Sequence, residues 1–120
     1  GEPSMSETTS IPIAIQASPE PPTRNAAVQR CCQARQHSLE LSREKRRDDF
    51  DTQQYAGYAY RSAMPDLAGY ENIRDFIACT AHGMVIGAIE AIEATKYLYA
   101  AQVALGVLHH EPKAQKQPAA

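Results

Sequence analysis

The sequence YENIRDFIACTAHGMVIGAIEAIEATKYLYAAQVALGVL, residues 70–108, decides the predicted fold. The chain has 120 residues, and thirteen of its twenty Leu, Ile, Val and Phe residues fall between Leu67 and Leu108. We therefore expect the hydrophobic core to be concentrated in the C-terminal half. A core built from about 40 residues is marginal alone, because small domains bury a small fraction of their surface. We expect self-association, or docking of the middle of the chain onto this half, to complete it.

Two helices are predicted within this stretch, over residues 70–89 and 93–109. In the first, small residues recur every four positions and form a groove along which another helix can approach closely. In the second, apolar residues follow alternating steps of four and three, as in a coiled-coil seam. The short connection predicts that the two helices form an antiparallel hairpin. The residues expected at the packing surface are Cys79, Gly83, Gly87, Leu98, Ala101 and Leu105.

Two further helices are predicted upstream, over residues 25–47 and 49–64. Neither Pro nor Gly interrupts the first, and either Thr23 or Asn25 can cap it. The second must end before Pro65, because a proline disfavours helical geometry at the residue that precedes it. The sequence leaves open whether these two helices are continuous.

The predicted fold class is all-α: a small helical bundle with a C-terminal antiparallel helix hairpin and disordered N- and C-terminal tails. Residues 25–110 are expected to form a single helical domain, because the chain is too short for two domains of ordinary size. Residues 1–24 hold five of the eight prolines and show no helical period. We therefore predict a disordered tail there, in which residues 1–4 are a remnant of expression. Residues 111–120 form a second predicted tail.

One segment of the N-terminal stretch differs from its surroundings. Ile11–Ile15 alternates large and small apolar residues, which favours an extended strand, and Pro12 limits such a strand to a sheet edge. The segment is either a short motif that adds to the sheet of a partner or an apolar part of a disordered tail. The sequence does not decide between these two interpretations.

Membrane, secretory and redox signals together predict a cytoplasmic protein. The longest apolar runs, residues 76–89 and 97–108, are shorter than the ~20 residues of a membrane span. The chain does not open with a basic region followed by an apolar stretch, as a secretory signal would. The three cysteines, Cys31, Cys32 and Cys79, are odd in number and two are adjacent. This pattern is a poor disulfide framework and suits a reducing compartment.

Charge is strongly segregated along the chain. Residues 24–47 contain seven basic and two acidic side chains, a local net charge of +5 in a chain whose total is −2. A basic helix can dock on an acidic protein surface or neutralise phosphates. Three of the six tyrosines follow in the next predicted helix, and tyrosine is favoured at protein interfaces. The residues predicted to bind a partner are Arg35, Arg43, Lys45, Arg46, Arg47, Tyr55, Tyr58 and Tyr60.

The sequence contains no recognised motif for catalysis, cofactor binding or metal binding. It lacks a glycine-rich phosphate loop, a nucleophile elbow and an H-E-x-x-H sequence. Cys79 and His82 share a helical face, but zinc needs four ligands, which usually come as repeated pairs. Cys79 is therefore predicted to be a small core residue. We expect no enzyme activity, no cofactor, no metal and no small-molecule substrate.

The predicted function is that of an adaptor or regulatory protein that binds another macromolecule through its basic helix and tyrosine-bearing surface. A protein partner or self-association is favoured. The alternative is a nucleic-acid-binding protein that uses the same basic helix on phosphates. A helix-turn-helix is not expected, because the last predicted helix carries Lys96 and no arginine. The overall charge also lacks the basic excess that is usual for nucleic-acid-binding domains.

Overall fold

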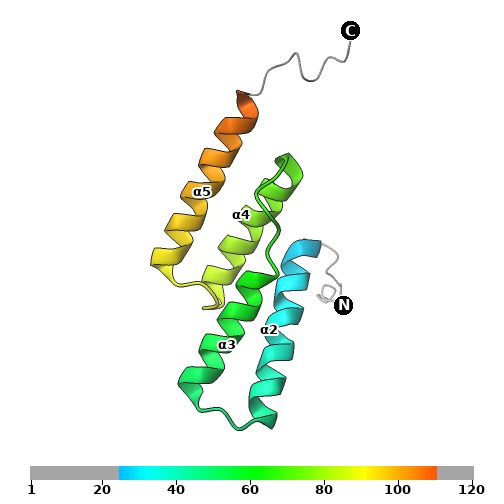
Figure 1. Ribbon diagram of the computed structural model, residues 1–120, viewed down its shortest axis with the longest axis vertical. Coiled ribbons are helices and arrows are strands. Elements are labelled where there is room, and N and C mark those ends of the chain that lie inside the picture. Colours follow the sequence, from blue (N-terminus) through cyan, green and yellow to red (C-terminus); the bar gives the residue numbers. More distant parts are fainter. Residues whose placement is uncertain (1–24, 111–120) are drawn as a thin grey trace, which may run out of the picture.

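The computed structural model describes residues 25–110, and the predictions for residues 1–24 and 111–120 lie outside these described residues. The described chain folds into helices arranged as two hairpins, one formed by α2 and α3 and the other by α4 and α5 (Figure 1). The helices are α2, Ala26–Glu44; α3, Asp49–Ser62; α4, Tyr70–Val85; and α5, Ala91–His109. The prediction of a small all-α bundle is confirmed.

The first hairpin begins with a capped helix and turns sharply after α2. The Asn25 side chain accepts hydrogen bonds from the backbone N–H groups of Ala27 and Val28, at 2.8 and 3.1 Å, which satisfies two of the unpaired donors at the start of α2. We predicted that this helix extends to residue 47, but it ends at Glu44. Asp48 then caps α3 by accepting from the Asp51 N–H at 2.7 Å, so α2 and α3 are separate helices.

The second hairpin also has a shorter first helix than predicted. The expected end at residue 89 is wrong, because α4 stops at Val85 and Gly87 turns the chain with a φ of 80°. The Ala88 N–H donates to the Gly83 carbonyl at 2.8 Å and closes the turn. The next helix, α5, therefore begins at Ala91. It runs back along α4 and forms the predicted antiparallel pair (Figure 1).

The hydrophobic core draws on both hairpins, so the prediction that it is concentrated in the C-terminal half is wrong. Ala27, Val28 and Cys31 of α2 are buried together with Tyr60 of α3 and Cys79 of α4. The two hairpins meet at this point because small residues let their helices approach closely. By contrast, α5 lies at the edge of the molecule and packs on α4, on the side away from α2 (Figure 1).

Candidate interaction surfaces

The cationic residues at the end of α2 form a surface turn that we call the basic turn: Arg43, Lys45, Arg46 and Arg47. Its backbone closes through two hydrogen bonds, from the Arg46 N–H to the Arg43 carbonyl at 3.2 Å and from the Arg47 N–H to the Ser42 carbonyl at 3.0 Å. This pair of bonds is the Schellman motif that ends many helices. The motif needs a left-handed residue, and Arg46 supplies it with a φ of 57°.

The side chains of the basic turn divide into two groups. Arg43, Lys45 and Arg46 are exposed, and no ion pair within residues 25–110 involves them. Arg47 is half-buried and has a structural role. Its Nη1 donates to the Ser42 hydroxyl at 2.9 Å, and its guanidinium lies 3.8 Å from the centre of the Tyr55 ring. The first three cations are therefore available to a partner, whereas Arg47 holds the turn.

Aromatic and acidic residues border the basic turn. Phe50 is exposed in the first turn of α3, next to Asp49 and Asp51, although the sequence analysis did not select it. Carboxylates are favoured at a helix N-terminus because the positive end of the helix dipole lies there. The letters DDFD place one aromatic residue among these acids, and this is the signal that could have identified Phe50 as an exposed apolar contact.

The predicted partner-binding residues do not form one continuous surface. Tyr55 joins the basic turn through Arg47, whereas Tyr58 lines a separate polar cleft between α3 and the start of α5. Arg35 is half-buried within α2, about two helical turns before the basic turn. Both Tyr55 and Tyr58 are exposed.

The prediction that Tyr60 binds a partner is wrong, because its side chain is 0% exposed and cannot serve as a surface anchor. Its hydroxyl donates to the Cys79 carbonyl at 2.6 Å, which satisfies the polar end of the ring inside the core. The small residues Ala56 and Gly57, about one helical turn earlier, are also buried. Small residues one turn before a tyrosine are the sequence signal for this buried face of α3.

The residues predicted to lie at the packing surface differ in how deeply they are buried. Cys79, Gly83 and Ala101 are buried, as expected of residues at helix contacts. Leu98 remains partly exposed, and Leu105 is half-buried. Gly87 is outside α4, is exposed and has no atom near the position of a Cβ, so it does not continue the small-residue groove. Its role is to turn the chain.

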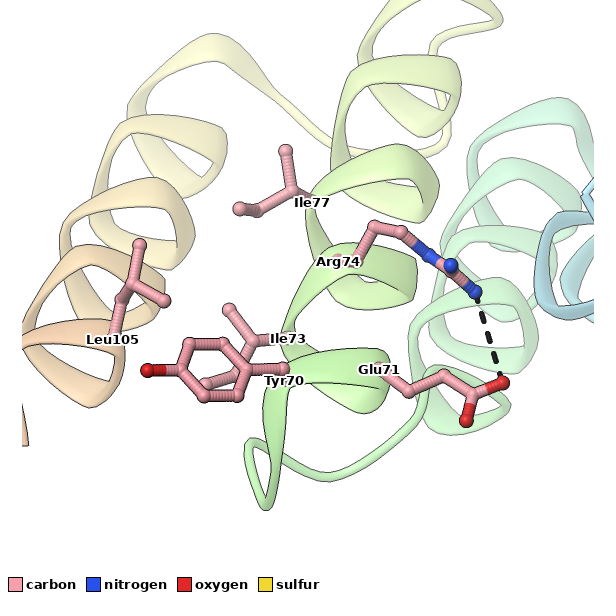
Figure 2. Close-up of a pocket in the computed structure, with 6 residues that line it drawn as sticks. All are labelled: Tyr70, Glu71, Ile73, Arg74, Ile77 and Leu105. Atoms are coloured by element: carbon pink, nitrogen blue, oxygen red, sulfur yellow. Dashed lines mark ion pairs between the residues drawn. The ribbon is translucent and has the colours of Figure 1, made fainter. Parts of the chain in front are cut away.

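An apolar cleft of about 690 Å³ lies between α4 and α5 and was not anticipated from the sequence. Tyr70 and Ile77 of α4 point toward α5, from which Leu105 contributes to the lining (Figure 2). The polar rim is formed by Arg74 and Glu71, whose side chains point away from α5 and lie 3.7 Å apart (Figure 2). The lining is mainly apolar and contains no Ser, Cys, His or Lys side chain, so the cleft is best suited to apolar contact.

Two thiols meet at the centre of the molecule. The sulfur atoms of Cys31 and Cys79 are 3.7 Å apart, and both side chains are fully buried. Burial raises the pKa of the Cys31 thiol to about 12 and also raises that of Cys79. Because the thiolate is the reactive form of cysteine, both residues are inert core groups at neutral pH. Among residues 25–110, no cluster of three or more His, Cys, Asp or Glu residues could hold a metal ion.

A polar contact joins the start of α2 to α4. The Asn25 amide donates to an Asp75 carboxylate oxygen at 2.8 Å. This bond is the largest cause of the lowered pKa of Asp75, and the adjacent Arg74 guanidinium, at 3.1 Å, lowers the pKa further. Asn25 therefore both caps α2 and holds the helix against α4.

Comparison with known proteins gives no family assignment: no family model, curated protein or solved structure matches the chain. Within the part of the chain that the structure describes, none of the helices has the length and apolar character needed to cross a membrane.

Proposed function

We propose that the protein is a non-enzymatic interaction protein that binds an acidic surface of a partner protein through the basic turn. The observation that carries this proposal is the backbone conformation of Arg46. A residue other than Gly in the left-handed region costs roughly 1–2 kcal/mol, and strained residues of this kind cluster at functional sites. Arg46 is exposed and has no ion pair among the described residues. No ion pair within the described fold therefore offsets the strain at this residue.

A second turn in the same chain shows what the backbone alone requires. At the end of α4, Gly87 occupies the equivalent left-handed position, and the two corresponding hydrogen bonds close that turn. Glycine adopts this conformation without a steric cost. The presence of a cation at the position where the other turn uses glycine supports a role for the charge. Arg43 and Lys45 beside it, with Phe50 and Tyr55 as apolar contacts, complete a surface suited to an acidic protein.

The test compares two variants that lose the same net charge. In the first, Arg43→Gln, Lys45→Gln and Arg46→Gln neutralise the basic turn. In the matched control, Gln29→Glu, Gln33→Glu and Gln102→Glu add three negative charges at exposed positions elsewhere on the helices. Both variants should keep the wild-type circular dichroism spectrum, because all six side chains are exposed. Arg47 is left intact because it bonds to Ser42 and stacks on Tyr55.

The measurement is quantitative capture from a lysate of the native host with wild-type protein, the neutralised variant and the control as baits. We expect at least one protein to be retained by the wild type and the control and reduced about tenfold or more with the neutralised variant. That protein should then bind the purified wild-type chain directly. Equal retention by all three baits would show that the basic turn is not the contact surface.

Nucleic-acid binding is the alternative outcome of the same design. Phosphate contacts release counterions, so affinity for DNA or RNA would fall steeply as salt rises. We expect no salt-sensitive binding of labelled duplex DNA, single-stranded DNA or RNA at ~50 mM salt, because Asp48, Asp49 and Asp51 border the basic turn. Tight, salt-sensitive binding that is lost in the neutralised variant would show that the basic turn binds a nucleic acid and would contradict the proposed protein partner.

A further inference from the structure

The last helix is apolar around almost its whole circumference and yet is largely exposed. Only two of its nineteen residues, Ala94 and Ala101, are buried. Its only Asp, Glu, Lys or Arg residues are Glu93 and Lys96, which pair with each other at 3.9 Å. A helix that is hydrophobic on all sides is normally enclosed within a larger protein body. Among residues 25–110, α5 packs mainly on α4, so its other side lacks the cover from the described helices that this composition requires.

The uncovered side of α5 forms a defined stripe, which we call the outer face: Ile92, Tyr99, Val103 and Val107. These side chains are between 48% and 70% exposed. Their spacing of seven, four and four residues places them on one side of an α-helix, about opposite the buried Ala94 and Ala101. This arrangement gives α5 two apolar faces, and α4 covers one of them.

The chemistry of the outer face fits another copy of the same chain. The outer face is apolar apart from Lys96, which lies on the same side of the helix and pairs with Glu93 at 3.9 Å. A surface with a single paired lysine offers little to a nucleic acid or to a strongly charged protein. A two-fold interface brings the same patch from each subunit together, and this apolar patch packs on itself without repulsion where its one lysine is kept away from the same lysine of the second copy. The four exposed side chains amount to an area on the order of 500 Å², more than half of the roughly 800 Å² per partner in a stable interface.

The order of residues on the outer face also favours one orientation of the two helices. In an antiparallel pair centred between residues 99 and 100, Ile92 faces Val107 of the second copy and Lys96 faces Val103 of the second copy. In a parallel pair, Lys96 would face the same lysine of the second copy, which is unfavourable. Antiparallel packing also places opposite ends of the two helix dipoles beside each other.

We propose that the protein forms a two-fold symmetric dimer in which the outer faces of α5 pack antiparallel against each other. The proposal is independent of partner binding by the basic turn, which lies at the far end of the other hairpin (Figure 1). The dimer carries two basic turns, so a partner that presents two acidic sites is bound with increased avidity.

The first test is the mass of the full chain in solution, measured by light scattering over a range of concentrations. We expect wild-type protein to have the mass of two chains. Val103→Lys places a second lysine opposite Lys96 in the antiparallel pair, so this variant should dissociate about tenfold or more readily. Gln102→Lys adds the same charge at the neighbouring exposed position, off the outer face, and should remain a dimer. Circular dichroism checks that both variants are folded.

The second test probes the orientation through charge rescue. In the antiparallel pair, Lys96→Glu combined with Val103→Lys places a glutamate opposite each new lysine, and the double variant should recover the dimer. A monomeric wild type at high concentration would overturn the proposal. So would a dimer that tolerates Val103→Lys, or a dissociated Val103→Lys variant that Lys96→Glu fails to restore. If Val103→Lys does not fold, Ile92→Lys with Val107→Glu provides the same rescue at the ends of the interface.

Discussion

Arg46 and Gly87 occupy the same position in two copies of one backbone motif, and they differ in the steric cost of the conformation that the motif requires. Both residues lie in the left-handed region, with φ of 57° and 80°. Both follow a helix whose last carbonyls accept hydrogen bonds from the turn. Only the glycine adopts this conformation without a steric cost. The basic turn therefore has a cation at the strained position where the other turn has glycine, and the proposed partner binding rests on this difference.

Exchange of the side chains at these two positions should have opposite effects on stability. Arg46→Gly relieves the left-handed strain, although glycine also raises the entropy of the unfolded chain, so we expect a net stabilisation of about 0.5–1 kcal/mol. Gly87→Ala should destabilise by about the same amount. The free energy of unfolding in urea measures both. If Arg46→Gly fails to stabilise, the conformation at residue 46 is not strained. The same variant should weaken partner binding.

At the scale of the element, α4 owes its position to the absence of a side chain at Gly83. A Cβ added there would lie 2.6 Å from the Ile89 side chain and 2.7 Å from the Tyr60 ring. Such distances are too short for carbon atoms, so the core residues on both sides would have to move. The Tyr60 ring of α3 and the Ile89 side chain can pack directly against α4 at this point because residue 83 is glycine.

Two glycine-to-alanine substitutions separate this packing effect from helix propensity. Gly83→Ala should destabilise the fold by about 1–3 kcal/mol, because overpacking outweighs the better helix propensity of alanine. Gly106 is the matched control: it is also helical, but an added Cβ meets no atom within 4 Å. Gly106→Ala should therefore stabilise by up to ~1 kcal/mol. Thermal and urea unfolding of both variants measure the difference, and an equal effect of the two would contradict the close contact at residue 83.

The positions of most helices could be predicted from local sequence. The Asn25 cap, the apolar spacing and Pro65 predict where helices lie, because each acts through the backbone of its own segment. The ends of α2 and α4 were predicted several residues too late. In α4 the turn at Gly87 is visible in the sequence, but it was interpreted as part of a small-residue groove. In α2 an arginine occupies the position of a turn glycine, so no sequence signal marked that end.

At the scale of the whole molecule, a few polar contacts hold the two hairpins together around the buried residues. The Tyr60 hydroxyl bonds to the Cys79 carbonyl, and the Arg61 guanidinium donates to the Ala88 carbonyl at 3.1 Å. The Asn25 amide bonds to the Asp75 carboxylate at 2.8 Å. Of these contacts, only the last involves a group that titrates at acidic pH.

Acid should therefore weaken the contact between α2 and α4. The pKa of Asp75 is lower in the folded protein than its ordinary value of 3.8, so the unfolded chain binds the proton more readily. The stabilisation by this carboxylate is fully present above that value and is lost as the pH falls through the folded-state pKa. Asp75→Asn keeps an acceptor for Asn25 but does not titrate. We expect this variant to lose less stability than wild type between about pH 5 and about pH 3 in urea unfolding; equal losses would show that Asp75 does not contribute.

The sequence by itself determined that the described chain is helical, where most of its helices begin, and that its cations gather at the end of one helix. Only the tertiary structure decided that Tyr60 is buried while Tyr55 and Tyr58 are exposed, that the core includes α2, and that the outer face of α5 is uncovered. The physical reason is that helix formation depends on contacts within a few residues. Burial depends on which distant helix packs against a face, and the spacing within a single helix does not contain that information.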